Sequence, residues 1–393
     1  MIFFKIAFLL ILTLASLQPV NAIQEVILDI DGEKDESSQE DVITDDEWYF
    51  DMHGKTLREK IAEIRAKEVN EIHKSHYLLE EILTKKFDKS PVDTMHIFGY
   101  YRAGLAMDFY PNDEDLGYEF NDIEGGVNGK FKNEKTFYEA RLRFKPQHDY
   151  NFFQYLPGNV YLASTAIPHH TVLIGNTRTA TGYEGAKSSS VIPMIARSQI
   201  SRNFGNIRKL GVRVKGNYDL VEYDFGGYSS DTYFKEFLPG GEFAGWVTLK
   251  PLGKTNGKYG VLKMGSGITS GQNDIDYTVL GAYASYTYKK FYTNFEWGKA
   301  DGYNGAKTLT SNKAEGLYTT LGYRITPKVQ LVARYDQYRP NLDIANNMQK
   351  EYSAGVNYFL KGQALKLMLN YVFCQNQAKD NSHRIILGTQ IML

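Results

Sequence analysis

The chain has little cysteine and, after its N-terminus, no long hydrophobic run. Its 393 residues include one cysteine, Cys374, so no disulfide can form within the chain, and this cysteine lies too far from the N-terminus to carry a lipoprotein anchor. The mean hydropathy of -0.40 is too polar for a bundle of membrane helices. No later segment reaches ~18 consecutive apolar residues, so insertion into a membrane must use a β-barrel.

Enzyme signatures are missing as well. The sequence has no Gly-x-Ser-x-Gly motif, no phosphate loop ending in Gly-Lys-Ser/Thr and no zinc-type His/Glu helix. The pairs His73 with His76 and His169 with His170 lack the acidic or cysteine partners of a metal site. We therefore predict no enzyme, no cofactor and no metal.

The N-terminal residues predict export. Lys5 precedes an apolar stretch, residues 6–17, that is too short to span a bilayer as a mature helix, and Ala22 ends a small-residue cleavage site. We expect residues 1–22 to be a signal peptide removed after Ala22. Residues 23–54 are rich in acidic residues and serine and predict a flexible linker.

Residues 55–90 are predicted to form a periplasmic helix. Apolar residues recur at steps of mostly three or four from Leu57 to Leu83, with charges between them, and Pro91 ends the pattern. The helix over 55–87 is a possible coiled coil, although the step from Ile64 to Val69 breaks a strict heptad. Up to this point the exported chain is acidic, whereas residues 91–393 carry an excess of lysine and arginine.

From residue 91 to residue 393 the period changes to two. Between Tyr138 and Lys145, apolar residues alternate with charged ones, a pattern that one strand of a soluble sandwich would also show. Further along, strands of about ten residues are separated alternately by short turns and by long polar loops, the topology of outer-membrane barrels. The long loops are predicted at 229–242, 268–276, 300–314, 338–349 and 374–382. We predict an all-β transmembrane barrel of about sixteen antiparallel strands over residues 91–393.

Several segments share a more specific pattern. They are residues 171–184, which include Gly175, Arg178 and Gly182; residues 193–198, Pro-Met-Ile-Ala-Arg-Ser; residues 202–212, which include Arg208 and Gly211; and residues 357–360, 367–371 and 384–387 near the end. Together these segments resemble the phosphate-selective porin O and P family. The chain departs from the family pattern at Ala196, at Thr-Ala-Thr 179–181 and at its last residue, Leu393. The resemblance implies a trimer of barrels with about sixteen strands, loops folded into the lumen and a basic constriction.

Basic side chains that face the lumen are the candidate pore-lining and anion-binding residues. They are Arg141, Arg143 and Lys145 on one strand, Arg213 and Lys215 on another, and Arg178, Arg197 and Arg202 from the segment that carries the resemblance. Two alternatives stay open. Glu222 and Asp224 can neutralise Arg213 and Lys215 across a tight turn, and Arg197 and Arg202 can brace an inward loop.

The function predicted from these features is passive diffusion through an outer-membrane porin that prefers anions such as phosphate. Its expected partners are copies of itself in a homotrimer, outer-membrane lipid and the barrel-assembly machinery, whose terminal signal the apolar end at Ile391 and Leu393 resembles. Nucleic acid is not expected, because the basic residues alternate with lipid-facing ones. The alternative is a plugged structural or surface-interaction barrel without conductance, with loops 229–242 and 300–314 as contact surfaces.

Overall fold

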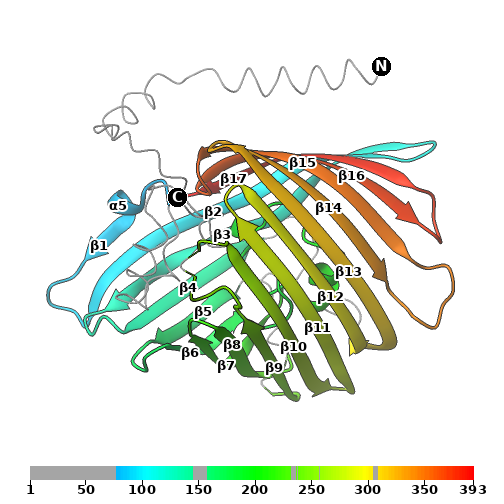
Figure 1. Ribbon diagram of the computed structural model, residues 1–393. Coiled ribbons are helices and arrows are strands. Elements are labelled where there is room, and N and C mark those ends of the chain that lie inside the picture. The colour runs from blue at the N-terminus through cyan, green and yellow to red at the C-terminus, as the bar shows by residue number, and fades with distance from the viewer. Residues whose placement is uncertain (1–76, 145–156, 232–235, 237, 256, 304–308) are drawn as a thin grey trace, which may run out of the picture. The chain divides into compact units, whose positions relative to one another are not determined.

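The computed structural model describes residues 77–144, 157–231, 236, 238–255, 257–303 and 309–393, and its strands form an antiparallel sheet closed into a barrel (Figure 1). Each strand from β2 onward pairs with the next one along the chain. The ring closes where β17 pairs with β2, from His383 opposite Phe109 to Met392 opposite Tyr100. Sixteen strands, β2 to β17, make the ring, which confirms the predicted barrel. Among the described residues, no helix has the length and hydrophobicity needed to span a bilayer.

The strands differ widely in length. Their bounds are β2 Val92–Phe109, β3 Glu114–Phe131, β4 Thr136–Phe144, β5 Pro157–Ser164, β6 His170–Arg178, β7 Arg208–Asn217, β8 Val221–Ser229, β9 Gly241–Leu249, β10 Val261–Asn273, β11 Ile275–Tyr288, β12 Phe291–Tyr303, β13 Leu309–Thr326, β14 Val329–Arg339, β15 Gln349–Lys361, β16 Leu365–Asn376 and β17 Ser382–Met392. The consecutive strands β4 to β9 are all short, whereas β2, β3 and β13 each have 18 residues. Since about nine to eleven tilted residues cross a bilayer, the longest strands must extend beyond it.

Connections fall at two ends of the barrel, which we name by their content. The turn end holds the connections that follow β3, β5, β7, β9, β11, β13 and β15, together with Leu393, and the loop end holds the others. Two predicted connections were wrong. The expected long loop at 268–276 is a tight hairpin through Asp274, which takes a φ of 58° that aspartate tolerates, and the expected short turn after β9 spans residues 250–260.

The two faces of the sheet have opposite chemistry. Outward positions carry exposed apolar side chains such as Leu321, Leu331 and Leu369, whereas the inward positions next to them are buried and polar, as at Gln330 and Asn370. The predicted alternation of strand faces therefore holds. Exposed tyrosines and phenylalanines such as Tyr323, Tyr358 and Phe291 lie near the strand ends at the turn end, where aromatic girdles mark the membrane interface.

The chain before β2 differs from the predicted helix. Residues 55–76 lie outside the described part, α5 covers only Glu80–Leu83, and Thr84–Lys86 form the short strand β1. The β1 strand pairs with β2 from Thr84 opposite His96 to Lys86 opposite Thr94, beyond the point where β17 ends. Backbone groups of β2 that lack a partner in β17 thus find one in β1, and this pairing overrides the local helical pattern.

Charge on the outward face should be costly. Leu369 lies near the middle of β16, with 47% of its surface exposed on the apolar outer face. Replacing Leu369 by arginine should lower the free energy of unfolding in lipid vesicles by about 2–4 kcal/mol. The matched control is Gln375→Arg on the same face near the strand end, where the cost should fall to about 0–1 kcal/mol. Equal costs at both positions, measured by denaturant unfolding, would contradict the assignment of this face to lipid.

Candidate functional site

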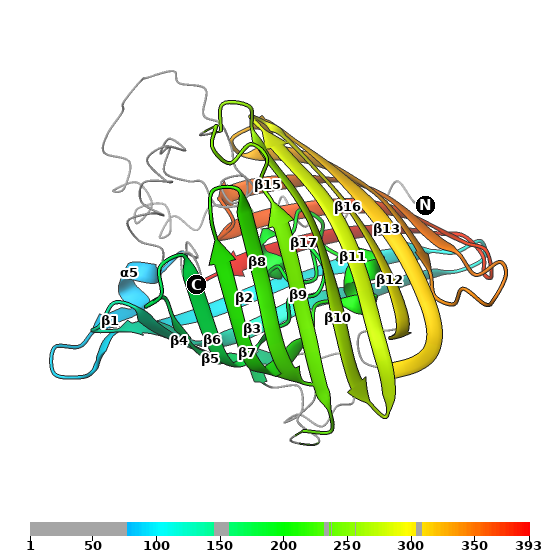
Figure 2. The ribbon, with the colours of Figure 1, turned by 60° about the horizontal axis from the view of Figure 1, so that its bottom comes forward.

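A segment between β6 and β7, residues 179–207, folds into the barrel. Figure 2 shows this green segment inside the ring of strands. It contains a short 3-10 turn, η1 (Ser189–Val191), and the helix α7 (Gln199–Phe204), whose N-cap Ser198 accepts a hydrogen bond from Ser201 N. Ile200 and Phe204 of α7 pack with Tyr318 and Tyr338 of the wall in one buried cluster. We call residues 179–207 the inward segment.

Arg102 holds the middle of the inward segment against the wall. Its side chain comes from β2 and is completely buried. The Nη1 atom donates to Ser189 O at 2.5 Å and to Gln390 Oε1 at 2.8 Å, and Nη2 donates to Ile192 O at 3.3 Å and to Met194 O. Backbone carbonyls thus surround this guanidinium and make it a structural cation.

Carboxylates hold the parts of the inward segment on either side of the residues that Arg102 binds. Glu184 of the inward segment forms a buried ion pair with Arg334 of β14, with Nη2 and Oε2 2.6 Å apart, and its Oε1 accepts from Ser198 N at 2.6 Å. Glu296 of β12 accepts from Tyr183 N at 2.6 Å, and Asp336 of β14 accepts from Gln199 N at 2.7 Å. The donors and acceptors of the inward segment therefore bind the wall formed by β2 and β12 to β17.

Strands β3, β4 and β7 carry a cluster of arginines around one carboxylate. Glu124 of β3 binds Arg141 Nη1 at 2.6 Å, Arg143 Nε at 3.0 Å and Arg208 Nη2 at 3.3 Å. Glu139 binds Arg141 Nε at 2.8 Å. These five residues, which we call the Glu124 cluster, carry three positive and two negative charges, so the cluster keeps an excess of positive charge.

Two other basic residues of β7, Lys209 and Arg213, each have an acidic partner of their own. Arg213 Nε donates to Asp224 Oδ1 at 2.7 Å, and Lys209 Nζ binds Glu242 in a fully buried pair. Lys215 lies opposite Asp224 in the pairing of β7 with β8, and Glu222 binds Lys250 at 3.0 Å. The ion-pair alternative thus describes Arg213 correctly.

The remaining predicted residues lie in different environments. Arg197 is buried and donates to Glu184 O at 2.6 Å and Lys187 O at 2.8 Å, so it braces the inward segment. Arg202 is 39% exposed and binds Glu351 at 2.6 Å. Arg178 is buried at the end of β6 and donates to Asn206 Oδ1, while Lys145 lies outside the described residues.

Sequence reasoning missed four residues that organise this site: Glu124, Arg102, Lys209 and Arg334 in its ion-pair role. Glu124 shares the inward face of β3 with Gly126 and Asn128, at steps of two residues. This spacing could have predicted an inward carboxylate. Its three arginine partners could not be read, because they depend on the pairing of β3 with β4 and on the approach of β7.

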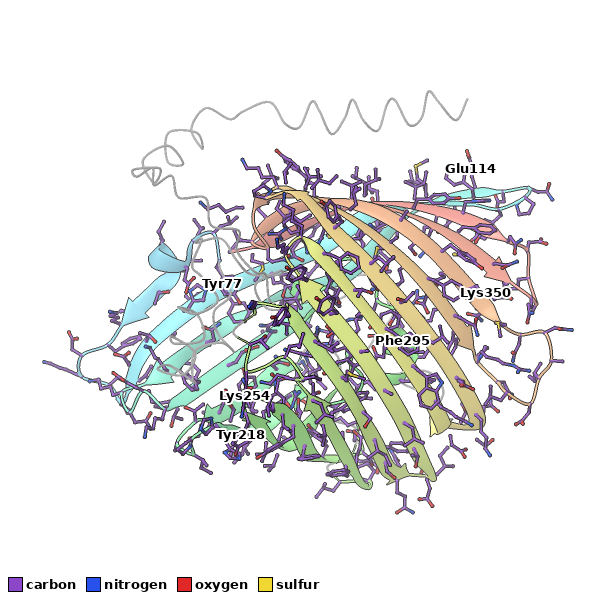
Figure 3. The ribbon with its side chains drawn as sticks, in the orientation of Figure 1. Tyr77, Glu114, Tyr218, Lys254, Phe295 and Lys350 are labelled. Carbon is purple, nitrogen blue, oxygen red and sulfur yellow. The ribbon has the colours of Figure 1, made fainter. Side chains whose placement is uncertain are left out.

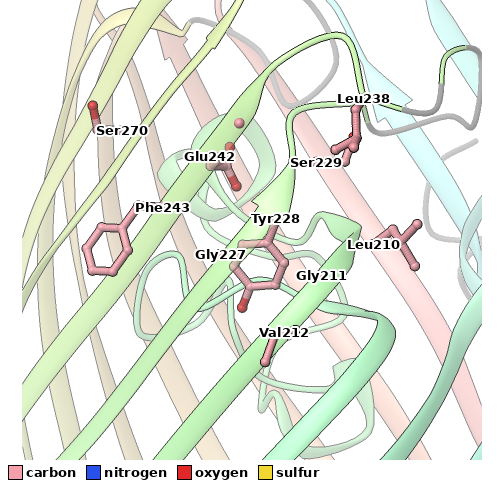
Figure 4. A pocket seen from close by; sticks show the side chains of 11 residues that line it. Leu210, Gly211, Val212, Gly227, Tyr228, Ser229, Leu238, Glu242, Phe243 and Ser270 are labelled. Atoms are coloured by element: carbon pink, nitrogen blue, oxygen red, sulfur yellow. The ribbon is translucent and has the colours of Figure 1, made fainter.

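One pocket lies on the outside of the barrel and not in its lumen. It has a volume of about 680 Å³ and lies on the outer face near the loop end, over Gly227, between Val212 and Phe243 (Figure 4). The space over Gly227, where another residue would place its side chain, is open, and this opens the groove. The groove is an outer feature of the wall and not part of the lumen.

Comparisons with known proteins agree with this architecture. The family model "Phosphate-selective porin O and P" matches residues 256–389, which cover most of β10 to β17. The predicted resemblance to this porin family is confirmed. Residues 171–212, which carried much of that prediction, lie outside the matched range. No curated protein sequence matches the chain.

Solved porins share the fold at low sequence identity. The outer membrane channel DcaP of Acinetobacter baumannii is 13% identical, with a TM-score of 0.55 over 78% of this chain and 99% of the other. The anion-selective porin from Comamonas acidovorans is 11% identical, with a TM-score of 0.54 over 76% of this chain and 99% of the other. OmpT of Vibrio cholerae, folded in vitro and in trimer form, is 12% identical, with a TM-score of 0.50 over 76% and 99%. The chain is a porin-like barrel.

Proposed function

We propose that the protein is a water-filled diffusion channel of the bacterial outer membrane that prefers anions, phosphate among them. The observation that carries the proposal is the Glu124 cluster, in which Arg141, Arg143 and Arg208 share one carboxylate of β3. The side chains of Arg141 and Arg143 keep 14% and 17% of their surface accessible.

An excess of guanidinium groups at a narrow place selects for anions in two ways. Fixed positive charge raises the local concentration of anions and repels cations over the ~8–10 Å reach of electrostatics at physiological salt. A planar guanidinium can also bind two oxygens of a phosphate at once. Because the carboxylates of Glu124 and Glu139 already hold the arginines in place, a passing anion meets preorganised donors.

The proposal includes export and assembly. A signal peptide cleaved after Ala22 would deliver the chain to the periplasm, the barrel-assembly machinery would insert it, and three copies would form the channel. The turn end, where Leu393 lies, would then face the periplasm, as would residues 55–76 of the helix predicted over 55–90. The trimer form recorded for OmpT, which shares the fold, supports a homotrimer here.

Single-channel recording in a planar bilayer tests the proposed function. Under a KCl gradient, the reversal potential should have the sign of chloride preference, and added phosphate should reduce the chloride current by competing for the arginines. Conductance steps without anion preference would support the channel and contradict the proposed anion selectivity.

The dense bonding of the inward segment gives the second candidate its support. A segment whose backbone binds Arg102, Glu296 and Asp336 fills part of the lumen, as a plugged structural barrel would require. The same recordings separate the two functions. Folded protein that inserts without any conductance would favour the plugged barrel over the channel.

A further inference from the structure

Both halves of the turn end carry lysines, but the acidic residues of its connections lie in one half only. The connections after β9, β11, β13 and β15, residues 250–260, 289–290, 327–328 and 362–364, contain no aspartate or glutamate. These connections and the adjoining end of β15 carry Lys250, Lys254, Lys258, Lys289, Lys290, Lys328 and Lys361. In contrast, three of the connections between β1 and β8 each include an acidic residue, namely Asp88, Glu134 and Asp219.

Five of these lysines form a continuous exposed arc. Lys254, Lys258, Lys290, Lys328 and Lys361 are all exposed and follow one another along four successive turns; we call them the basic arc. Figure 3 shows Lys254 at the same end of the barrel as Tyr218, and Glu114 and Lys350 at the opposite end. Lys250 is not part of the arc, because it binds Glu222 and Asn217.

Aromatic side chains of the outer face accompany the basic arc. Lys258 Nζ lies 5.3 Å from the centre of the Tyr259 ring, and this ring is 55% exposed. Tyr286 OH donates to Tyr259 O at 2.9 Å, which joins the turn after β9 to β11. Further along the arc, the outward rings Phe291, Tyr323 and Tyr358 precede or follow the lysine-bearing turns, and they are 38%, 49% and 42% exposed.

The aromatic neighbours fix the depth of the arc in a membrane. Exposed tyrosine and phenylalanine rings at strand ends mark the boundary between hydrocarbon and headgroups. Lysines directly beside them reach the headgroup layer, because their apolar stems can lie along the rings while the ammonium groups extend toward water. An anion at that depth is the phosphate of a lipid headgroup.

We propose that the basic arc binds the headgroups of anionic phospholipids in the leaflet at the turn end. Five ammonium groups without an acidic residue in the same connections attract a negatively charged lipid and give no comparable advantage to a zwitterionic one. The connections that carry lysine without an acidic residue lie on one half of the rim, so the lipid should gather along β9 to β16. The inference requires only that the barrel spans a membrane and is independent of ion selectivity.

Spin-labelled lipids provide the test. The full exported protein is reconstituted in phosphatidylcholine vesicles, and electron spin resonance measures the lipid fraction immobilised by the barrel at low salt. Labelled phosphatidylglycerol should associate about three times as strongly as labelled phosphatidylcholine. The variant with all five arc lysines changed to glutamine should lose this preference, and a variant limited to Lys254, Lys290 and Lys328 should lose part of it.

A matched control removes the same charge from the other half of the rim. It changes Lys85, Lys86, Lys89, Lys132 and Lys135 to glutamine and should retain the preference for phosphatidylglycerol. Absence of a preference in the unmodified protein, its persistence in the arc variant, or its equal loss in the control would each overturn the proposal. Loss of the preference on adding inorganic phosphate at constant ionic strength would overturn it too, in favour of a site for free phosphate.

Discussion

Changing Arg141 and Arg143 together to glutamate should turn the channel from anion preference to cation preference. At present Arg141 and Arg143 pair with the carboxylates of Glu124 and Glu139. The change replaces these two positive charges by two negative ones, so four carboxylates would lie side by side. Only Arg208 would remain as a cation of the cluster. The permeability ratio of chloride to potassium should fall at least about tenfold, which corresponds to about 1.4 kcal/mol, a modest amount for a change of four units of charge in one cluster.

The reversal potential in a KCl gradient measures this ratio directly. The matched control is Lys132→Glu with Lys135→Glu, which makes the same change in net charge on the exposed turn after β3, outside the lumen. The milder pair Arg141→Gln and Arg143→Gln adds no charge repulsion that would disturb folding, and it should give an intermediate ratio. An unchanged permeability ratio of chloride to potassium in both arginine variants would show that these arginines do not determine the selectivity of the channel.

The sequence predicts the barrel well because its signal is local. Alternation along each strand follows from the pleat, so Arg213 of β7 was predicted to face inward, and it is buried while its neighbour Val212 is exposed. The same reasoning failed where pairing decides the structure. Thr84–Lys86 carry a helical pattern and form a strand only because β2 offers unpaired backbone beyond the end of β17.

The charged site was less predictable, because charge balance depends on contacts across strands. The pattern along β4 shows only Glu139 as an acidic residue on the face of Arg141, but the register of β3 against β4 places Glu124 opposite Arg143, next to Arg141. Arg197 was a candidate for the pore, and its partners are carbonyl groups of the inward segment itself. The path of the inward segment decides which arginines bind backbone oxygens and which remain accessible to an anion. That path has no periodic signal in the sequence.

Removing one partner of the buried pair between Glu184 and Arg334 should have the largest effect on stability. Both side chains are nearly inaccessible, at 5% and 3%, and their charged atoms are 2.6 Å apart. In Arg334→Met the Glu184 carboxylate would remain buried without its cation, at an expected cost of about 3–5 kcal/mol in the free energy of unfolding. Since Glu184 also accepts from Ser198 N at the start of α7, the inward segment should loosen, and the open-channel current should become noisier.

The double variant Glu184→Gln with Arg334→Met separates the cost of an unpaired charge from the loss of packing. Glutamine retains an oxygen for Ser198 N and leaves no buried charge, so most of the stability and the quiet current should return. Arg384→Ala provides the comparison with a more accessible pair, because Arg384 and Asp108 are 33% and 14% accessible, and its cost should be only about 0–1 kcal/mol. A double variant as unstable and as noisy as Arg334→Met would mean that shape, and not charge compensation, holds the inward segment in the lumen.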